Sequence, residues 1–409
     1  RLTTASKPST CPCIRTNYNK FYELQTRGTK TFGIGSYTGD NTVTGVSINS
    51  AGSPRDYHRD LFSVSVGGKT NLNNWIANID LTYASGLYDQ PIYYDGTFNY
   101  RGLNANMDFS DRDAPQFNFT NGDPNNPANY KTSSYINRHQ FAHDKDGQGS
   151  LNVQRTFNLS DKNKLMLKFG GRYKYKEDSH TRNYFQYTML PGTSVTMDNF
   201  LSDYSRNDYF QGRYNLSGTI ANGYLMEDYY QANMSKFTQS ETYTRQNTDP
   251  DSYDGTETMG AAYMMGKLTL NKLDIITGLR YERTGFEYNG NIVNFSNTGV
   301  YVNTQKVAVN SAFDGFFPSL NLKYAINQTT NLRAAVTRSL SRPGYYDLVP
   351  WQEVEPNRKR MKIGNPQLDQ SKSTNFDFLF EHYLKSLGLI SAGIFYKNVD
   401  DYIYESIYK

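Results

Sequence analysis

Two pairs of side chains in the sequence have the spacing of metal ligands. His139 and His143 are four residues apart, which would bring both imidazoles to one face of a helix, but they lie in a polar segment without a second ligand motif. We therefore interpret them as residues of a solvated loop. Cys11 and Cys13 are the two cysteines of the chain, and they could form a local disulfide or remain free thiols. A zinc or iron–sulfur role would need further cysteine ligands, which the sequence lacks.

Carboxylates near the middle of the chain are the other candidate ligands. Asp249, Asp251 and Asp254 place oxygen donors at nearly alternating positions, as calcium-binding loops do, although the full EF-hand pattern is absent. Ordinary turn chemistry explains the same residues and is the preferred interpretation. A calcium ion bound by this loop is thus the one cofactor that the sequence leaves as an alternative. No Ser/His/Asp arrangement and no glycine-rich phosphate loop is present, so we do not expect an enzyme.

Aromatic rings beside positive charge indicate a binding site near the end of the chain. Tyr345, Tyr346 and Trp351 precede the basic residues Arg358 and Arg360. Aromatic faces can stack on a sugar ring or a chelate, and guanidinium groups bind anionic oxygens. We expect these five residues to bind a ligand. Loop packing or an aromatic belt at a membrane surface would explain the same rings.

The composition limits the elements that can position these side chains. The 409 residues include 43 Lys and Arg against 39 Asp and Glu, and this balance argues against a nucleic-acid partner. Mean hydropathy is −0.72, and no stretch has the roughly 18 apolar residues of a membrane-spanning helix. The 35 Tyr and 23 Phe supply much of the apolar content. A transmembrane β-barrel remains compatible, because its lipid-facing apolar residues alternate with polar residues of the lumen.

Alternation of apolar and polar residues dominates the chain and predicts β-hairpins. Between Trp75 and Tyr83 the odd positions are apolar, and we expect this strand to pair with Leu61–Gly67 across a turn at Gly67–Asn71. Further alternating runs flank polar turns, so ten strands are predicted, with a weaker pair near residues 18–24 and 29–37. These further turns are Ser160–Asn163, Asn271-Lys272, Asn327–Thr330 and Lys385-Ser386.

Short turns alternate with long connections, which we place at residues 85–147, 176–256, 285–315 and 340–372. An outer-membrane barrel has short periplasmic turns and long extracellular loops, so the predicted fold is an all-β, antiparallel transmembrane barrel. Backbone groups in lipid must all be paired, which requires a closed barrel. The polar residues of the alternating strands should then face the lumen. Those we assign to the lumen are Arg280, Glu282, Arg338, Asn375, Asp377 and Glu381.

The last third of the sequence resembles the barrel of TonB-dependent outer-membrane receptors. The resemblance covers about residues 257–404 and includes Gly278–Thr284, Asn331–Pro343, Ser373–Asp377 and Gly393–Lys397. Within it, the residues that match the family pattern most specifically are Ser341, Arg342, Pro343, Gly364, Asn365 and Pro366.

The resemblance implies a 22-stranded barrel of the Gram-negative outer membrane, plugged by an N-terminal domain, that imports a scarce ligand with energy from TonB. The ligand would be a siderophore, cobalamin, an oligosaccharide or a peptide. Implied partners are outer-membrane lipid, lipopolysaccharide and the TonB complex, and a surface lipoprotein partner is left open. The lumen residues would then contact the plug, unless water and the other lumen charges satisfy them.

The sequence departs from the family pattern, because no plug, no TonB-contacting segment and no closing strand is found. We therefore expect residues 1–409 to be an incomplete barrel domain that lacks the N-terminal plug and the last strands. A passive, porin-like or structural surface barrel that displays its loops to partners is the alternative function. A soluble β-rich binding protein is a third interpretation.

Overall fold

The computed structural model describes residues 13–406 except 34–35, 38–40, 112, 114–115, 205, 210, 213, 217, 356–358, 385 and 387. Cys11 and the side chain of Cys13 therefore lie outside the described residues. The main path of the sheet contains eleven strands, each antiparallel to its neighbour along this path. In spatial order they are β1 (Cys13–Gly33), β3 (Thr42–Leu72), β4 (Trp75–Asp108), β6 (Lys131–Asn158), β7 (Asn163–Met189), β11 (Tyr253–Leu270), β12 (Leu273–Phe295), β13 (Tyr301–Ala325), β14 (Thr330–Ser341), β17 (Ser371–Leu384) and β18 (Gly388–Asp400).

Short elements lie between these strands. The helices are α1 (Gly223–Ala232), α2 (Glu241–Thr248) and α3 (Tyr345–Leu348), together with the 3-10 turns η1 (Pro127–Asn129), η2 (Met197–Asn199) and η3 (Met234–Lys236). The short strands are β2 (Ser36–Tyr37), β5 (Gln116–Phe119), β8 (Arg206–Tyr209), β9 (Tyr214–Leu216), β10 (Phe237–Gln239), β15 (Gln352–Glu355) and β16 (Arg360–Ile363). Within the described ranges, no helix is long and apolar enough to cross a membrane.

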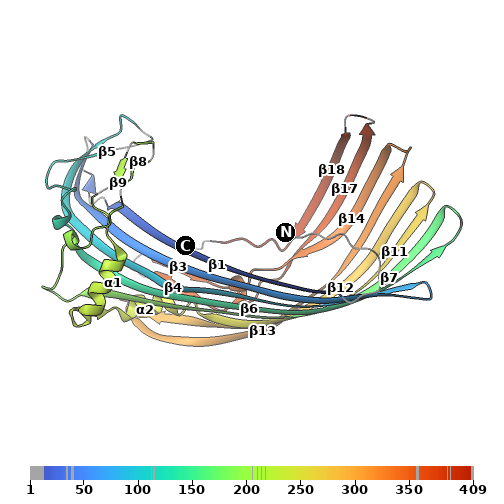
Figure 1. Ribbon diagram of the computed structural model, residues 1–409, viewed down its shortest axis with the longest axis horizontal. Coiled ribbons are helices and arrows are strands. Elements are labelled where there is room, and N and C mark those ends of the chain that lie inside the picture. Colours follow the sequence, from blue (N-terminus) through green and yellow to red (C-terminus); the bar gives the residue numbers. More distant parts are fainter. Residues whose placement is uncertain are drawn as a thin grey trace.

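The sheet is strongly curved (Figure 1), and β1 and β18 are the first and last strands of its spatial order. The all-β, antiparallel fold class is thereby confirmed. Among the described residues the sheet does not close on itself, so the 22-stranded size stays a prediction.

Tight turns join the strands at one end. The pairings Asn158↔Lys164, Leu270↔Leu273, Ala325↔Asn331 and Leu384↔Gly388 confirm four of the predicted turns. The predicted turn at Gly67–Asn71 is wrong, because β3 and β4 stay paired as far as Leu72↔Trp75. The chain turns instead at Asn73 and Asn74, whose φ angles of 45° and 71° suit asparagine in a two-residue hairpin loop.

At the other end the strands extend far into the predicted loops. Strand β4 continues to Asp108, β7 continues to Met189, and residues 296–300 alone connect β12 to β13. The weaker predicted pair at the start of the chain is mostly one strand, β1. Beyond the lipid both faces of a strand can be polar, so the alternation that marks a half-apolar strand disappears while backbone pairing continues.

The two faces of the sheet differ in chemistry. The outer face carries apolar side chains opposite one another across β4, β6, β7, β11 and β12, through the pairs Ile79↔Leu151, Val153↔Phe169, Phe169↔Met264 and Met264↔Leu279. Polar and charged residues alternate with them on the inner face. Two clusters of buried side chains cover the extended ends of the strands, one on each face.

The outer cluster lies beneath α1. Tyr135 alternates in register with Leu151 and therefore belongs to the outer face, where its ring stacks on Tyr230 of α1 at 4.8 Å. The inner cluster contains Phe286, Tyr288 and Phe313, and the segment after β14 covers it.

Candidate functional site

A segment that we call the inner strap, residues 342–351, crosses the inner face where β14 ends. Proline at position 343 has no N–H to donate to a sheet, and the ladder stops before it. The strap then forms the short helix α3, in which the Asp347 carboxylate accepts a hydrogen bond from the Gly344 N–H at 3.1 Å. Leu348 and Val349 are buried in the inner cluster. A Cβ at Gly290 would lie 2.6 Å from Val349 Cγ1, so this close approach requires glycine.

The strap brings the three predicted aromatic residues together. The rings of Tyr346 and Trp351 stack with centroids 4.3 Å apart, and Trp351 Nε1 donates to the Tyr346 carbonyl at 2.7 Å. The Tyr345 ring lies 4.4 Å from Lys176 Nζ and 4.8 Å from the Tyr288 ring. Burial raises the pKa of Tyr345 and of Tyr346, so both hydroxyls keep their protons near neutral pH.

Of the two predicted arginines beyond the strap, the structure describes one, Arg360. Arg360 is exposed on β16, where it lies 3.7 Å from Glu405. Arg358 lies outside the described residues. The three aromatic residues therefore lie in one segment, and ligand binding by the five residues stays a prediction.

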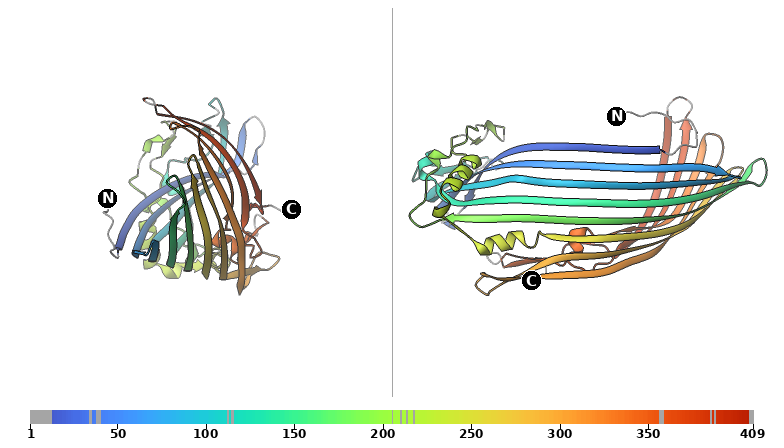
Figure 2. Two further views of the ribbon diagram at one scale, coloured as in Figure 1. Left: turned by 90° about the vertical axis from the view of Figure 1, so that its right-hand side faces the viewer. Right: turned by 60° about the horizontal axis from the view of Figure 1, so that its bottom comes forward.

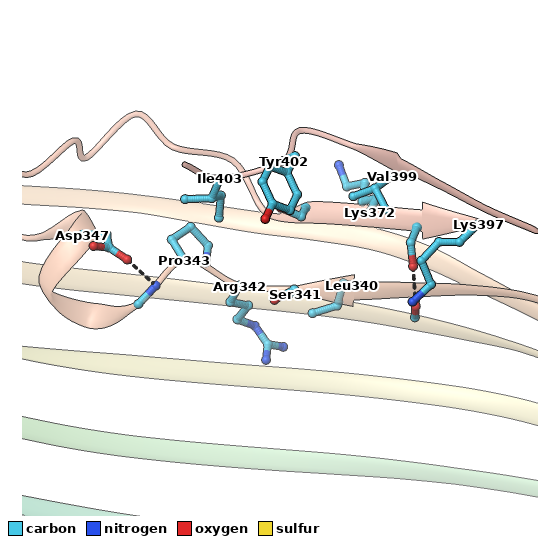
Figure 3. Close-up of a pocket in the computed structure, with 14 residues that line it drawn as sticks. Leu340, Ser341, Arg342, Pro343, Asp347, Lys372, Lys397, Val399, Tyr402 and Ile403 are labelled. Carbon is cyan, nitrogen blue, oxygen red and sulfur yellow. Dashed lines mark hydrogen bonds between the residues drawn. The ribbon is translucent and has the colours of Figure 1, made fainter. Parts of the chain in front are cut away.

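Ion pairs on the inner face connect Arg342, the first residue of the strap, to strand β12. Glu282, only 8% exposed, accepts hydrogen bonds from Arg280 Nε at 3.0 Å and from Arg342. Figure 3 shows Arg342 pointing toward the neighbouring strands from the rim of a cavity of about 460 Å³. Ser341, Pro343, Lys372 and Lys397 line the same cavity. The family-pattern residues Ser341, Arg342 and Pro343 therefore lie where the strap leaves the sheet.

The other family-pattern residues lie in a later segment that is hydrogen-bonded to the strap. The Gly364 N–H donates to the Trp351 carbonyl at 3.1 Å, and the Asn365 N–H donates to the Asp347 carbonyl at 2.7 Å. A Cβ at Gly364 would lie 2.0 Å from the Val349 carbonyl oxygen. Gly364 is thus required by packing. Pro366 comes directly after Asn365 in the sequence.

The register places five of the six predicted lumen residues on the inner face, and these are Arg280, Glu282, Asn375, Asp377 and Glu381. Glu381 accepts a hydrogen bond from Arg333 Nε at 2.9 Å. Arg338 is the exception. It is two residues from Val336, which pairs with Leu320 and Phe376, so Arg338 shares their outer face. The assignment of Arg338 to the lumen is therefore wrong.

The three aspartates of the predicted calcium loop have separate partners. Asp249 accepts from Thr304, Asp251 accepts from Arg182 and from Tyr346, and Asp254 accepts from Asn289 at 2.9 Å. Within the described part of the chain, no three His, Cys, Asp or Glu residues are grouped so that they could hold a metal ion. Calcium binding by this loop stays a prediction.

The two spaced histidines lie on strand β6 and not in a loop. His139 and His143 contact Asp89 at 2.8 Å and Ser85 at 3.1 Å. They have no metal-binding partner set within the described residues.

The sequence did not reveal a row of alternating arginines and tyrosines on the inner face, which we call the arginine–tyrosine row: Arg55, Tyr93, Arg138, Tyr184 and Arg182. Arg55 pairs with Tyr93, and Arg138 pairs with Tyr184, across β3, β4, β6 and β7. The guanidinium carbon of Arg55 lies 4.0 Å from the centroid of the Tyr93 ring. The guanidinium carbon of Arg138 lies 4.3 Å from the centroid of Tyr93 and 4.6 Å from that of Tyr184. Arg182 and Tyr346 both donate to Asp251, which links the row to the inner strap.

Comparison with known proteins gives one family. The family described as "TonB dependent receptor-like, beta-barrel" matches residues 87–408. No curated protein matches the chain.

Solved structures are similar at low identity. The Serratia marcescens hemophore receptor HasR, in complex with its hemophore HasA and heme, is 12% identical with a TM-score of 0.39, over 92% of this chain and 54% of that chain. The ferric-catecholate import receptor Fiu of Escherichia coli K12 is 11% identical with a TM-score of 0.40, over 94% and 58%. The siderophore receptor PiuA of Acinetobacter baumannii is 10% identical with a TM-score of 0.37, over 91% and 55%. The chain thus spans little more than half the length of the structures it matches.

Proposed function

Because the chain belongs to the TonB dependent receptor-like, beta-barrel family, we propose that it forms barrel strands of a receptor that imports a scarce ligand with energy delivered through TonB. Its place is the outer membrane, where the apolar outer face meets lipid. Lipopolysaccharide and the TonB complex are the proposed partners, and a surface lipoprotein over the mouth is a further proposed one. Siderophores, cobalamin, oligosaccharides and peptides are the proposed ligand classes.

The observation that supports this proposal is the inward fold of the inner strap. A passive pore conducts through an open lumen, whereas here an aromatic segment of the wall is folded across the inner face. Tyr346 and Trp351 offer a stacked aromatic surface, and Tyr345 lies beside the ammonium group of Lys176. We assign ligand contact to these three residues, and we propose that Arg358 and Arg360, which follow the strap in the sequence, bind anionic oxygens of the same ligand.

The natural protein, extracted from outer membranes, tests the proposal against a passive pore. We expect it to bind the purified periplasmic domain of TonB in a pull-down assay and to show no steady ion conductance in planar lipid bilayers. A general porin from the same membranes serves as the conducting control. Steady conductance without TonB binding would establish the passive pore instead.

A further inference from the structure

One charged side chain interrupts the apolar outer face near the tight turns. The register assigns alternating residues of six neighbouring strands to this part of the outer face, which we call the outer band. The outer band runs from Val64 to Leu72 in β3, from Trp75 to Tyr83 in β4, from Gly147 to Phe157 in β6, from Leu165 to Tyr175 in β7, from Ala262 to Leu270 in β11 and from Leu273 to Tyr281 in β12. The structure describes every residue of this band, and Arg155 carries its single charge.

Arg155 lies at the edge of the band that is nearest the tight turns. It pairs with Trp75, and Trp75 pairs with Leu72 at the last position before the turn. The guanidinium carbon of Arg155 lies 5.4 Å from the centroid of the Trp75 ring and 4.8 Å from that of Phe157. Aromatic girdles of a barrel lie at the membrane interfaces, and its tight turns face the periplasm. Arg155 therefore lies at the depth of the lipid headgroups of the periplasmic leaflet.

An open groove adjoins this guanidinium. Its volume is about 620 Å³, and Leu72, Asn73, Trp75, Val153 and Arg155 line it. Leu72 and Val153 make part of its wall apolar, whereas Arg155 contributes a cation. The Arg155 side chain is half-buried, so a molecule from the membrane can reach it. An apolar wall beside one cation matches an amphiphile with an anionic headgroup.

The surroundings of Arg155 supply no counter-charge. The outer band contains no carboxylate, and among the described residues none lies within ion-pair distance of this guanidinium. The next turn carries Asp161 and Lys162, whose charges cancel. A charged side chain on a lipid-facing surface is unfavourable unless a partner compensates it. A girdle explains the rings of Trp75 and Phe157, but it does not explain a cation between them.

We propose that the groove binds an anionic phospholipid of the periplasmic leaflet, whose phosphate oxygens accept hydrogen bonds from the guanidinium of Arg155. The planar guanidinium matches the paired oxygens of a phosphate group. The acyl chains lie along the apolar residues of the outer band. A zwitterionic headgroup fits less well, because its ammonium group would meet Arg155 and find no carboxylate on this face. The site is on the outer face, so it is separate from the lumen and from any imported ligand.

Native mass spectrometry of the natural full-length protein in detergent tests the proposal, with phosphatidylglycerol and phosphatidylethanolamine as separate probes. We expect phosphatidylglycerol to bind more tightly, and R155Q to weaken its binding about tenfold, because the variant loses charge-assisted hydrogen bonds. R155K keeps the charge but loses the planar fork, and it should bind with intermediate affinity. Circular dichroism and heat-modifiable gel mobility verify that each variant is folded.

Lys164 offers a matched control at the same end of the strands. It pairs with Asn158 and is exposed, and because it neighbours Leu165 of the outer band it lies on the inner face. K164Q removes one positive charge there and should leave the binding of phosphatidylglycerol unchanged. Inorganic phosphate at the concentration of the lipid should not displace it, because phosphate has no acyl chains to occupy the apolar wall.

Four results would overturn the proposal. These are no binding of phosphatidylglycerol, equal binding of phosphatidylethanolamine, an equal loss in K164Q, and displacement of the lipid by inorganic phosphate. The last result would indicate a simple anion site in place of a lipid site. Since neither TonB nor an imported ligand is present in the assay, its outcome is independent of the import function.

Discussion

Single charged residues on the inner face differ in importance according to their burial. Glu282 is 8% exposed and accepts from both Arg280 and Arg342, so two positive charges depend on one carboxylate. Removing one partner of a buried ion pair leaves an uncompensated charge, which is far costlier than the net contribution of the intact pair. Glu177, by contrast, pairs with Lys145 at 3.3 Å with both side chains nearly half exposed. Exposed pairs of this kind contribute little.

We expect E282A to lower the free energy of unfolding by about 3–5 kcal/mol, because Arg280 and Arg342 lose their common partner. The matched variant E177A should leave it nearly unchanged. Urea unfolding in detergent, followed by tryptophan fluorescence, measures both. Equal effects of the two substitutions would show that Glu282 does not anchor the strap.

At the scale of elements, helix α1 is held against the outer face by close contacts and by capping. The Asn222 side chain accepts from the Tyr224 N–H at 3.0 Å and so caps the first turn. A Cβ built on Gly52 of β3 would lie 2.0 Å from the Ala221 carbonyl oxygen, just before the helix. This contact is with backbone, which cannot move aside as a side chain can.

Substitution G52A should therefore displace the chain around residue 221 and loosen α1, at a cost of about 1–3 kcal/mol. Limited proteolysis of the extracted protein should then cleave near α1 several times faster than in the unaltered protein. G147A is the control, since a Cβ at Gly147 would meet nothing within 4 Å. Unchanged cleavage in G52A would mean that α1 is not held by this contact.

At the scale of the whole molecule, the two ends of the long strands are different. Tight turns join the strands at one end, whereas α1 and the longer connections gather at the other (Figure 2). In an outer-membrane barrel the tight turns face the periplasm. The apolar outer residues of β4, β6, β7, β11 and β12 lie near these turns, which places the membrane there and leaves the extended strands outside the cell.

This orientation predicts where an inserted epitope is accessible. An epitope after Gly192, whose φ is 80° and whose Cβ position is open, should be labelled by antibody on intact cells. An epitope at the Asn271-Lys272 turn should be labelled only after the outer membrane is permeabilised. Labelling in the reverse pattern would contradict the orientation.

The sequence by itself determined the hairpins and the family. Lipid on one side and a polar interior on the other impose strict alternation, so runs such as Trp75–Tyr83 could be assigned from residue types alone. The same rule, counted from Val336, would have placed Arg338 on the outer face. Ser341–Pro343 and Gly364–Pro366 carried the resemblance, and the family match over residues 87–408 confirms it.

Only the tertiary structure decided how far the strands extend and which side chains meet. Outside the lipid no alternation is required, so β4 and β6 could not be told from loops in residues 85–147. The arginine–tyrosine row joins Arg55, Arg138 and Arg182, which are separated by 83 and 44 positions in the sequence. Residues so far apart become neighbours only through the pairing register of β3, β4, β6 and β7, and no local pattern encodes that register.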